Sequence, residues 1–340
     1  MDERKIRILS AIVEQYIVTG EPIGSKALMN ILDINVSPAT IRNECAALEQ
    51  MGYLEQPHTS AGRIPSFAGY RLYVDELMMK NTIPDEDKLK IDQLLDGEDL
   101  TVEGIVQKAS TALAEITKCA TVVANSAPKF SVISKVEVIP TGKRLYVILM
   151  ITSSGSIKNK VCRLEFDLTN EQLEFFSNFM QENLEGISVS NISDEMMEKM
   201  ATAMGTYMMT LTPLIQGVCE MSRDLAKKNV IIEGETNLLA CKDIDTNEII
   251  SFLNNKNEFS KLLDESFSGL HVMFSKEKND FVISNSSIIT SPFQKGGKTA
   301  GMLGVIGPMR IDYAKIIPYL EYFTEKITDL ISDDEDENNI

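Results

Sequence analysis

Hydrophobic residues recur at every third or fourth position near the start of the chain, which is the spacing of amphipathic helices. The pattern predicts a first helix over residues 3–18, and Gly20 and Pro22 end it. A second, shorter run begins at Ser25, which is a suitable N-cap. The chain therefore opens with two short helices joined by a tight turn.

A third helix, over residues 38–51, has both ends marked in the sequence. Ser37 is a suitable N-cap, Pro38 occupies the first helical position, where a missing N–H costs nothing, and Gly52 follows the last turn. One face of this helix is an apolar stripe. The other face is small, polar and singly basic, and it consists of Ser37, Ala39, Thr40, Arg42, Asn43 and Ala46.

Three short helices, the third with a small, polar and singly basic face, fit the pattern of a helix-turn-helix. Its second helix enters the major groove, where bulky side chains clash and where Arg42 and Asn43 can form bidentate hydrogen bonds to bases. We expect Thr40 and Ser37 to lie nearer the phosphates. The N-terminus of the helix, near Ala39, is expected to donate backbone N–H groups to a phosphate. A three-helix protein-binding module fits the same pattern and remains an alternative.

A predicted β-hairpin follows the third helix. YLEQ and RIPS have the pattern of two short strands, and PHTSAG joins them, with Gly62 allowing a close turn of the backbone. Such a hairpin beside a reading helix is a wing. We expect its His58, Thr59, Ser60 and Arg63 to contact phosphates or the minor groove.

The rest of the chain alternates between helical and strand patterns. After a linker around Pro84, residues 88–118 have a helical pattern, and three segments up to residue 166 have strand patterns. Strand patterns return from residue 269 and are followed by a closing amphipathic helix. The order indicates one α+β domain whose sheet is assembled from both sides of an interruption, over roughly residues 168–268.

A helical face inside this interruption is rich in methionine. A methionine stripe can be an adaptable binding surface, although a core or a fixed helix interface is the commoner use. Both uses suit a dimer, because a two-fold mate can bury an apolar face that one subunit leaves open. The expected dimer-contact residues are Met196, Met200, Met204, Met208 and Leu211.

The charge of the chain is acidic but uneven. The net charge of −17 discourages nucleic-acid binding, yet residues 1–80 hold 8 basic against 10 acidic side chains, and the remainder holds 25 against 40. About −15 of the −17 therefore lies outside the helix-turn-helix segment. With 340 residues and 44% hydrophobic composition, two or three domains are expected.

Other classes of protein find little support. Five dispersed cysteines without a Cys-x-x-Cys pair argue against a disulfide framework or a zinc ribbon. A charged N-terminus and the lack of a long apolar run predict a cytoplasmic protein that does not enter a membrane.

The catalytic and cofactor motifs in the sequence are incomplete. GGKT at 296–299 has Pro292 where a phosphate-binding loop needs glycine, and two histidines leave little material for a zinc site or a catalytic triad. No catalytic residue, metal or cofactor is assigned, and an enzyme is not expected. A regulator that senses a small molecule in the second half of the chain remains the alternative.

Three motifs carry a resemblance to a known family. GEPIGSKAL (20–28), SPATIRNE (37–44) and LEQMGYLEQPHTSAGRIPSFAGYRLYVD (48–75) closely resemble the N-terminal region of the HrcA family of heat-inducible transcription repressors. The resemblance implies a winged-helix repressor of chaperone operons that binds an inverted repeat in double-stranded DNA as a homodimer. It further implies that the chaperonin GroEL keeps the repressor active, and that the α+β domain is GAF-like with an inserted dimerising segment.

The expected organisation combines the pattern and the resemblance. Its parts are a winged helix-turn-helix domain over residues 1–80, a linker over 81–90, a GAF-like domain over 91–167 and 269–331, an inserted dimerisation segment over 168–268, and an acidic disordered tail over 332–340.

Overall fold

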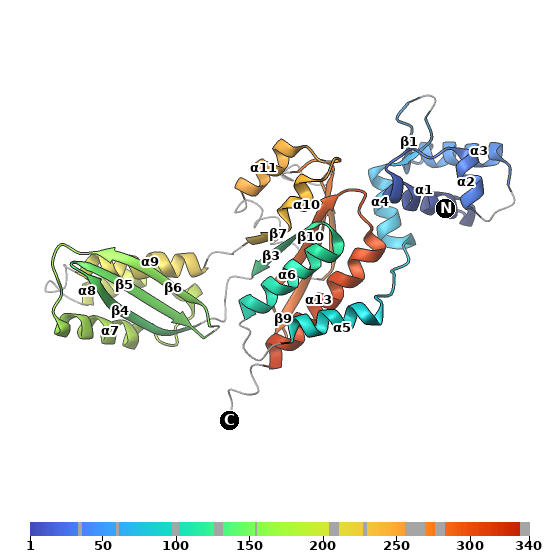
Figure 1. The fold of residues 1–340 in the computed structure, drawn as a ribbon. Helices are drawn as coiled ribbons and strands as arrows, with labels where there is room; N and C mark the ends of the chain where they lie inside the picture. Colours follow the sequence, from blue (N-terminus) through green and yellow to red (C-terminus); the bar gives the residue numbers. More distant parts are fainter. Residues whose placement is uncertain are drawn as a thin grey trace.

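The chain forms three bodies that lie in a row (Figure 1). The computed structural model describes residues 1–32, 36–58, 61–96, 102–125, 132–153, 155–203, 211–226, 230–255, 269–275 and 283–333. The N-terminal helices lie at one end, a sheet covered by helices lies in the middle, and a smaller sheet with its own helices lies at the other end. The fold is mixed α/β with antiparallel sheets.

The N-terminal helices follow the sequence pattern closely. They are α1 (Glu3–Thr19), α2 (Ser25–Ile31) and α3 (Pro38–Gln50). Gly20 adopts a left-handed conformation and donates its N–H to the Tyr16 carbonyl, which ends α1 as predicted. Ser37 caps α3 and Pro38 opens it, also as predicted. The expected cap at Ser25 is wrong, because Ser25 is already helical and Gly24 is the N-cap.

A short hairpin follows and confirms the predicted strand pair. It consists of β1 (Leu54–Glu55) and β2 (Ile64–Pro65), and the chain continues into α4 (Phe67–Leu72) and a π-helical turn, η1 (Tyr73–Leu77). Gly62 is required by packing, since a Cβ there would lie 2.2 Å from the Ile23 carbonyl oxygen. The hairpin therefore sits directly on the backbone that leads into α2.

The central body is a five-stranded antiparallel sheet with the strand order β7-β3-β10-β9-β8. Its strands are β3 (Ala120–Asn125), β7 (Val230–Glu233), β8 (His271–Phe274), β9 (Ser286–Lys295) and β10 (Lys298–Pro308). Its helices are α5 (Asp85–Leu95), α6 (Val102–Thr117), α10 (Glu235–Leu239), α11 (Thr246–Asn254) and α13 (Tyr313–Asp333).

Alternate residues of each strand face opposite layers of helices. Val123, Leu303 and Val305 belong to the core that contains α5, α6 and α13, and this core continues without a break into the N-terminal helices. Val122 and Met302 belong to a second core with α10 and α11. The N-terminal body is thus joined to the central body by shared apolar packing.

The third body has a core of its own. It consists of β4 (Ile133–Gly142), β5 (Leu145–Thr152), β6 (Ile157–Arg163), α7 (Asn170–Leu184), the 3-10 turn η2 (Val189–Asn191), α8 (Asp194–Ala203) and α9 (Thr212–Ala226). The sheet order is β4-β5-β6. One face of β5, including Ile148 and Met150, is buried against the helices.

This grouping corrects the expected segmentation. Strands β4 to β6 do not share a sheet with the C-terminal strands, whereas the sequence predicts one domain over residues 91–167 and 269–331. Conversely, β7, α10 and α11 belong to the central body, whereas the sequence predicts that they are part of the inserted segment over residues 168–268. Helix α5 also begins inside the expected linker 81–90. Alternation along a strand fixes which side is buried but not which strand is its partner, so the pattern could not separate two antiparallel sheets.

Two features are absent from the described parts of the chain. No helix found there is long and apolar enough to cross a membrane. The same residues contain no group of three or more His, Cys, Asp or Glu side chains that could hold a metal ion. The tail expected to be disordered over 332–340 begins inside α13, which extends to Asp333, and residues 334–340 lie outside the described residues.

Candidate nucleic-acid interface

Helix α3 presents the expected face to solvent. Ile41, Cys45 and Leu48 are buried under the helix. On the other side Ala39, Arg42, Asn43 and Ser37 are exposed, and Thr40 is half-buried. Because the exposed side chains are small, except for Arg42, another surface can approach the helix closely.

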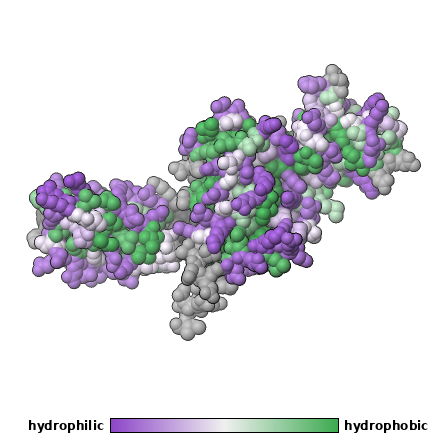
Figure 2. Space-filling model, viewed as in Figure 1, coloured by the Kyte–Doolittle hydropathy of each residue, from purple (hydrophilic) through white to green (hydrophobic). Residues whose placement is uncertain are grey.

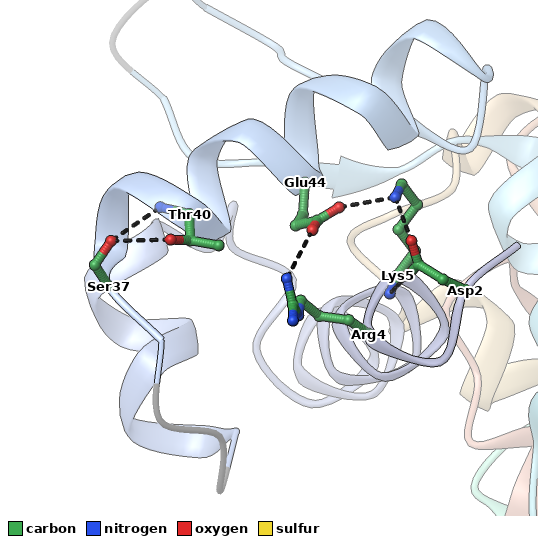
Figure 3. A network of polar contacts seen from close by, with 6 residues as sticks. All are labelled: Asp2, Arg4, Lys5, Ser37, Thr40 and Glu44. Carbon is green, nitrogen blue, oxygen red and sulfur yellow. Dashed lines mark hydrogen bonds and ion pairs between the residues drawn. The ribbon is translucent and has the colours of Figure 1, made fainter.

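The first turn of α3 is fixed by two hydroxyl groups (Figure 3). The Ser37 Oγ accepts a hydrogen bond of 3.2 Å from the Thr40 backbone N–H, and it lies 3.0 Å from the Thr40 Oγ1. Ser37 and Thr40 therefore serve first as the helix cap. The cap leaves the N-terminal backbone N–H groups at the edge of the exposed face.

An ion-pair network fixes α3 against the start of α1 (Figure 3). The Glu44 carboxylate lies 3.4 Å from Arg4 Nη1 and 2.9 Å from Lys5 Nζ, and Lys5 also pairs with Asp2 at 2.6 Å. The hydrogen bond from Lys5 lowers the pKa of Asp2, and the bonds to Asp2 and Glu44 raise the pKa of Lys5. These contacts orient the helix that carries Arg42, and they neutralise the basic charge of α1.

Arg63 is held inside the domain. Its guanidinium forms an ion pair of 2.8 Å with Glu49 at the end of α3, and its side chain is only 19% exposed. Its backbone exchanges hydrogen bonds of 2.9 and 3.0 Å with Ile23. The residue thus ties the hairpin to both α2 and α3. Of the other hairpin residues, His58 is exposed, and Thr59 and Ser60 lie outside the described residues.

Most basic side chains of residues 1–80 have an acidic partner. Within the described part of the chain, Lys26 and Arg42 have none, and both are exposed on α2 and α3. Sequence reasoning missed Lys26. The sequence indicates that both basic residues lack a partner within their helices, because no Asp or Glu lies three or four positions from either one. The paired residues are Arg4 and Lys5 with Glu44, Arg7 with Glu3, Arg63 with Glu49, Arg71 with Asp75, and Lys80 with Glu321.

The methionine stripe lies inside the third body. Met200 and Leu211 are buried in the core under β4 to β6, and Met196 packs against it half-buried. Met204 and Met208 lie outside the described residues. The described part of the stripe is core, which is the commoner use of such a pattern.

A different apolar surface of the third body is open. On the face of the sheet away from the helices, Val147 lies between Ile139 and Val161, and Ile151 pairs with Ile157. Ile139, Val161 and Ile157 are 41%, 58% and 59% exposed. Hydrophobic side chains gather over these strands in Figure 2. We call Ile139, Val147, Ile151, Ile157 and Val161 the open sheet face.

Comparisons with known proteins cover nearly the whole chain. Residues 103–317 match the family model described as the HrcA protein C terminal domain. The heat-inducible transcription repressor HrcA of Acetivibrio thermocellus is 34% identical over 96% of this chain and 95% of its own length. The protein of the same name from Clostridium botulinum is 32% identical over 98% of both chains.

A solved structure supports the fold over a similar extent. A crystal structure described as that of a hypothetical protein has a TM-score of 0.63 and 21% identity over 98% of this chain and 99% of its own. The two relatives that match over nearly their full length are transcription repressors, and they place this chain in that class. The chain belongs to the HrcA family, which confirms the resemblance carried by the N-terminal motifs.

Proposed function

We propose that the chain represses transcription by reading DNA with α3, and that residues 1–80 are a winged helix-turn-helix. The observation that carries the proposal is the exposed Arg42 beside Asn43 on an otherwise small face. Arg42 matches the edge of guanine and Asn43 matches adenine. Family membership in a class of named repressors supports the same function.

Backbone contacts to DNA are assigned to the groups around this face. Lys26 at the start of α2 lies where the first helix of a helix-turn-helix crosses the phosphate backbone. The capped turn of Ser37 and Thr40, together with the N–H of Ala39, would receive a second phosphate. His58 would act from the wing with Thr59 and Ser60. Arg63 would position the wing, and it would reach a phosphate only after leaving Glu49.

The repressor is proposed to act as a homodimer on an inverted repeat. The open sheet face is the described apolar surface best suited to a second copy, since β-branched side chains on both subunits can interdigitate across a two-fold axis. This assigns the contact to β4, β5 and β6 instead of the methionine stripe. The third body would then be the dimerisation domain.

The central body is proposed to be GAF-like, and the chaperonin GroEL is proposed as a partner that restores active repressor after heat. Refolding the denatured protein with and without GroEL, and measuring operator binding in each sample, tests this partner. Equal recovery in the two samples would argue against it.

Fluorescence anisotropy tests the DNA-binding proposal directly. The purified protein would be titrated onto a chaperone-operon inverted repeat and onto a scrambled duplex over a series of salt concentrations. We expect a preference for the repeat, with a salt slope that counts phosphate contacts. Equal weak binding to both duplexes by refolded, dimeric protein would overturn sequence reading by α3.

A further inference from the structure

A cleft opens on the central body beside its junction with the N-terminal helices. Its volume is about 630 Å³, which is within the range of small-molecule sites. The end of α6, the segment around α10 and the turn from β10 into α13 line it. Four of the lining residues are basic and two are acidic: Lys118, Lys242, Arg310 and Lys315, and Asp243 and Asp312.

This excess of positive charge is unusual for the molecule. The chain as a whole carries −17, whereas the charged side chains that line the cleft sum to a positive value. Lys118, Lys242 and Lys315 are exposed, and none has an acidic partner among the residues that the structure describes. Three lysines without counter-ions around one concavity attract anions.

Lys118 is also held in an unusual backbone conformation. Its φ is +55°, at the end of α6, where its N–H bonds to the Ala114 carbonyl. This left-handed position normally takes glycine, and a lysine there is strained by roughly 1 kcal/mol or more. The residue accepted at this position is a lysine, and its side chain lies at the rim of the cleft.

Arg310 connects the cleft to the DNA-reading domain. Its Nη2 pairs with Asp243 at 2.8 Å, and its Nη1 donates to the Ile17 carbonyl in the last turn of α1 at 3.2 Å. The guanidinium lies against Gly20, where a Cβ would be 3.3 Å from Cζ. The remaining Arg310 Nε is buried and has no hydrogen-bond partner. Because this N–H is closed to the cleft, the role of Arg310 is to link the wall of the cleft to α1.

We propose that this cleft binds a small phosphate-bearing molecule, with its phosphate oxygens paired with Lys118, Lys242 and Lys315. Arginine and lysine are the side chains best suited to phosphate, arginine by its fork of N–H donors and lysine as a mobile charge. The volume of the cleft accommodates a molecule of nucleotide size.

Binding there stabilises the docked arrangement of the N-terminal helices. A phosphate held between Lys242 and Lys315 restrains the segments that carry Asp243 and Arg310, and the ion pair of these two residues keeps the guanidinium on the Ile17 carbonyl. The ligand therefore acts on the orientation of the DNA reader, and this consequence rests on the proposed function. Binding of the phosphate to the cleft does not rest on the proposed function, so the binding and the effect on the DNA reader can be tested separately.

Isothermal titration calorimetry on the full-length protein without DNA tests the binding step. The probes are ADP and inorganic pyrophosphate, with citrate as a polyanion that lacks phosphate. We expect ADP or pyrophosphate to bind more tightly than citrate. The variant Lys118→Gln/Lys242→Gln/Lys315→Gln should bind the phosphate probe at least about tenfold more weakly.

A matched control separates the site from overall charge. Lys143→Gln/Lys158→Gln/Lys199→Gln removes the same charge from exposed positions of the third body and should leave the affinity unchanged. Equal weakening in both variants, or the absence of binding by either phosphate probe to the unaltered protein, overturns the proposal. Citrate binding as tightly as the phosphates overturns the phosphate assignment.

Hydrogen exchange measures the link to the N-terminal helices. With the phosphate probe bound, the amides around Gly20 should exchange more slowly. In Arg310→Lys this protection should disappear, because lysine lacks the planar fork of N–H donors that holds Asp243 and the Ile17 carbonyl at once. Unchanged exchange around Gly20 with the probe bound would overturn the link. Loss of operator binding with intact probe binding would count against the proposed function alone.

Discussion

Arg42 and Lys26 are alike in charge and exposure, but their positions on α3 and α2 predict different effects on DNA binding. Arg42→Ala should weaken operator binding by about 1 to 3 kcal/mol and reduce the preference for operator over scrambled DNA. Anisotropy titrations on the two duplexes measure both quantities. Equal loss on both duplexes would show that Arg42 contacts phosphate and not a base.

Lys26→Ala should weaken binding to both duplexes to a similar degree and lower the salt slope by about 1, because a phosphate contact carries no sequence information. Arg7→Ala is the control, since Arg7 is exposed on α1 and paired with Glu3. If Lys26→Ala leaves the salt slope unchanged, α2 does not lie on the DNA backbone.

Gly62 is predicted to determine whether the hairpin can dock. In Gly62→Ala the new Cβ would clash with the backbone of Ile23, and neither backbone can move without breaking the Ile23–Arg63 hydrogen bonds. We expect a loss of at least about 2 kcal/mol in the free energy of unfolding. In the control Gly24→Ala, where the Cβ meets open space, only the N-cap preference changes, at about 1 kcal/mol or less. Urea unfolding of both variants gives the comparison.

Residues with local roles could be predicted from the sequence, and residues with distant partners could not. Ser37, Pro38 and Gly20 act within one helical turn, so their roles follow from the neighbouring residues. Arg63 is different. Its partner Glu49 lies 14 positions away across the hairpin, and a solvated loop arginine and an anchored one have the same local sequence.

At the scale of elements, the open sheet face gives a prediction about assembly. Val161→Lys places a charge on the proposed contact and should shift the proposed dimer toward monomer in sedimentation experiments. The control is Val18→Lys, because Val18 is 78% exposed on α1. A dimer that survives Val161→Lys at micromolar concentration would exclude the open sheet face as the contact.

The packing of α5 on α13 predicts a loss of stability at alkaline pH. Tyr319 donates to Asp87 at 2.5 Å and Tyr322 donates to Asp92 at 2.8 Å, and burial with these bonds raises both pKa values to about 12, from 10.0. The unfolded chain loses these protons first as the pH rises. The contribution is therefore complete below pH 10 and disappears between pH 10 and 12.

The variant Tyr319→Phe/Tyr322→Phe keeps both rings and removes the titrating hydroxyls. Its unfolding free energy should fall less steeply across this pH range than that of the unaltered protein. The same slope in both proteins would contradict the assignment of the alkaline transition to these two contacts.

Element types were predictable, whereas element partners were not. The strand patterns at β4, β5, β6 and β10 and the closing helix α13 were each identified from periodicity. Strand β3 was missed because it follows α6 after two positions and is buried on both faces, so it shows no alternation of apolar and polar residues. The methionine face was recognised as apolar, but its burial against its own sheet depends on tertiary packing.

At the scale of the whole molecule, Arg71 is predicted to help hold the N-terminal body against the central body. Its Nη1 donates to the Val272 carbonyl at 2.7 Å and its guanidinium lies over Phe274, which also packs on Phe67. Arg71→Ala should speed amide exchange in α4 by about tenfold or more while leaving α7 unchanged. Arg7→Ala is again the control. Equal exchange in the two variants would show that apolar packing alone holds the two bodies together.

The order of strands in the central sheet also determines when the sheet can be completed during synthesis of the chain. Strand β3 lies between β10 and β7, so it stays incomplete until residue 308 has left the ribosome. At about 5 to 20 residues per second, the finished N-terminal helices wait roughly 10 to 50 seconds for the surface on which they dock. Each newly made repressor passes through this interval with unpaired strand edges, which are sites where another chain can pair.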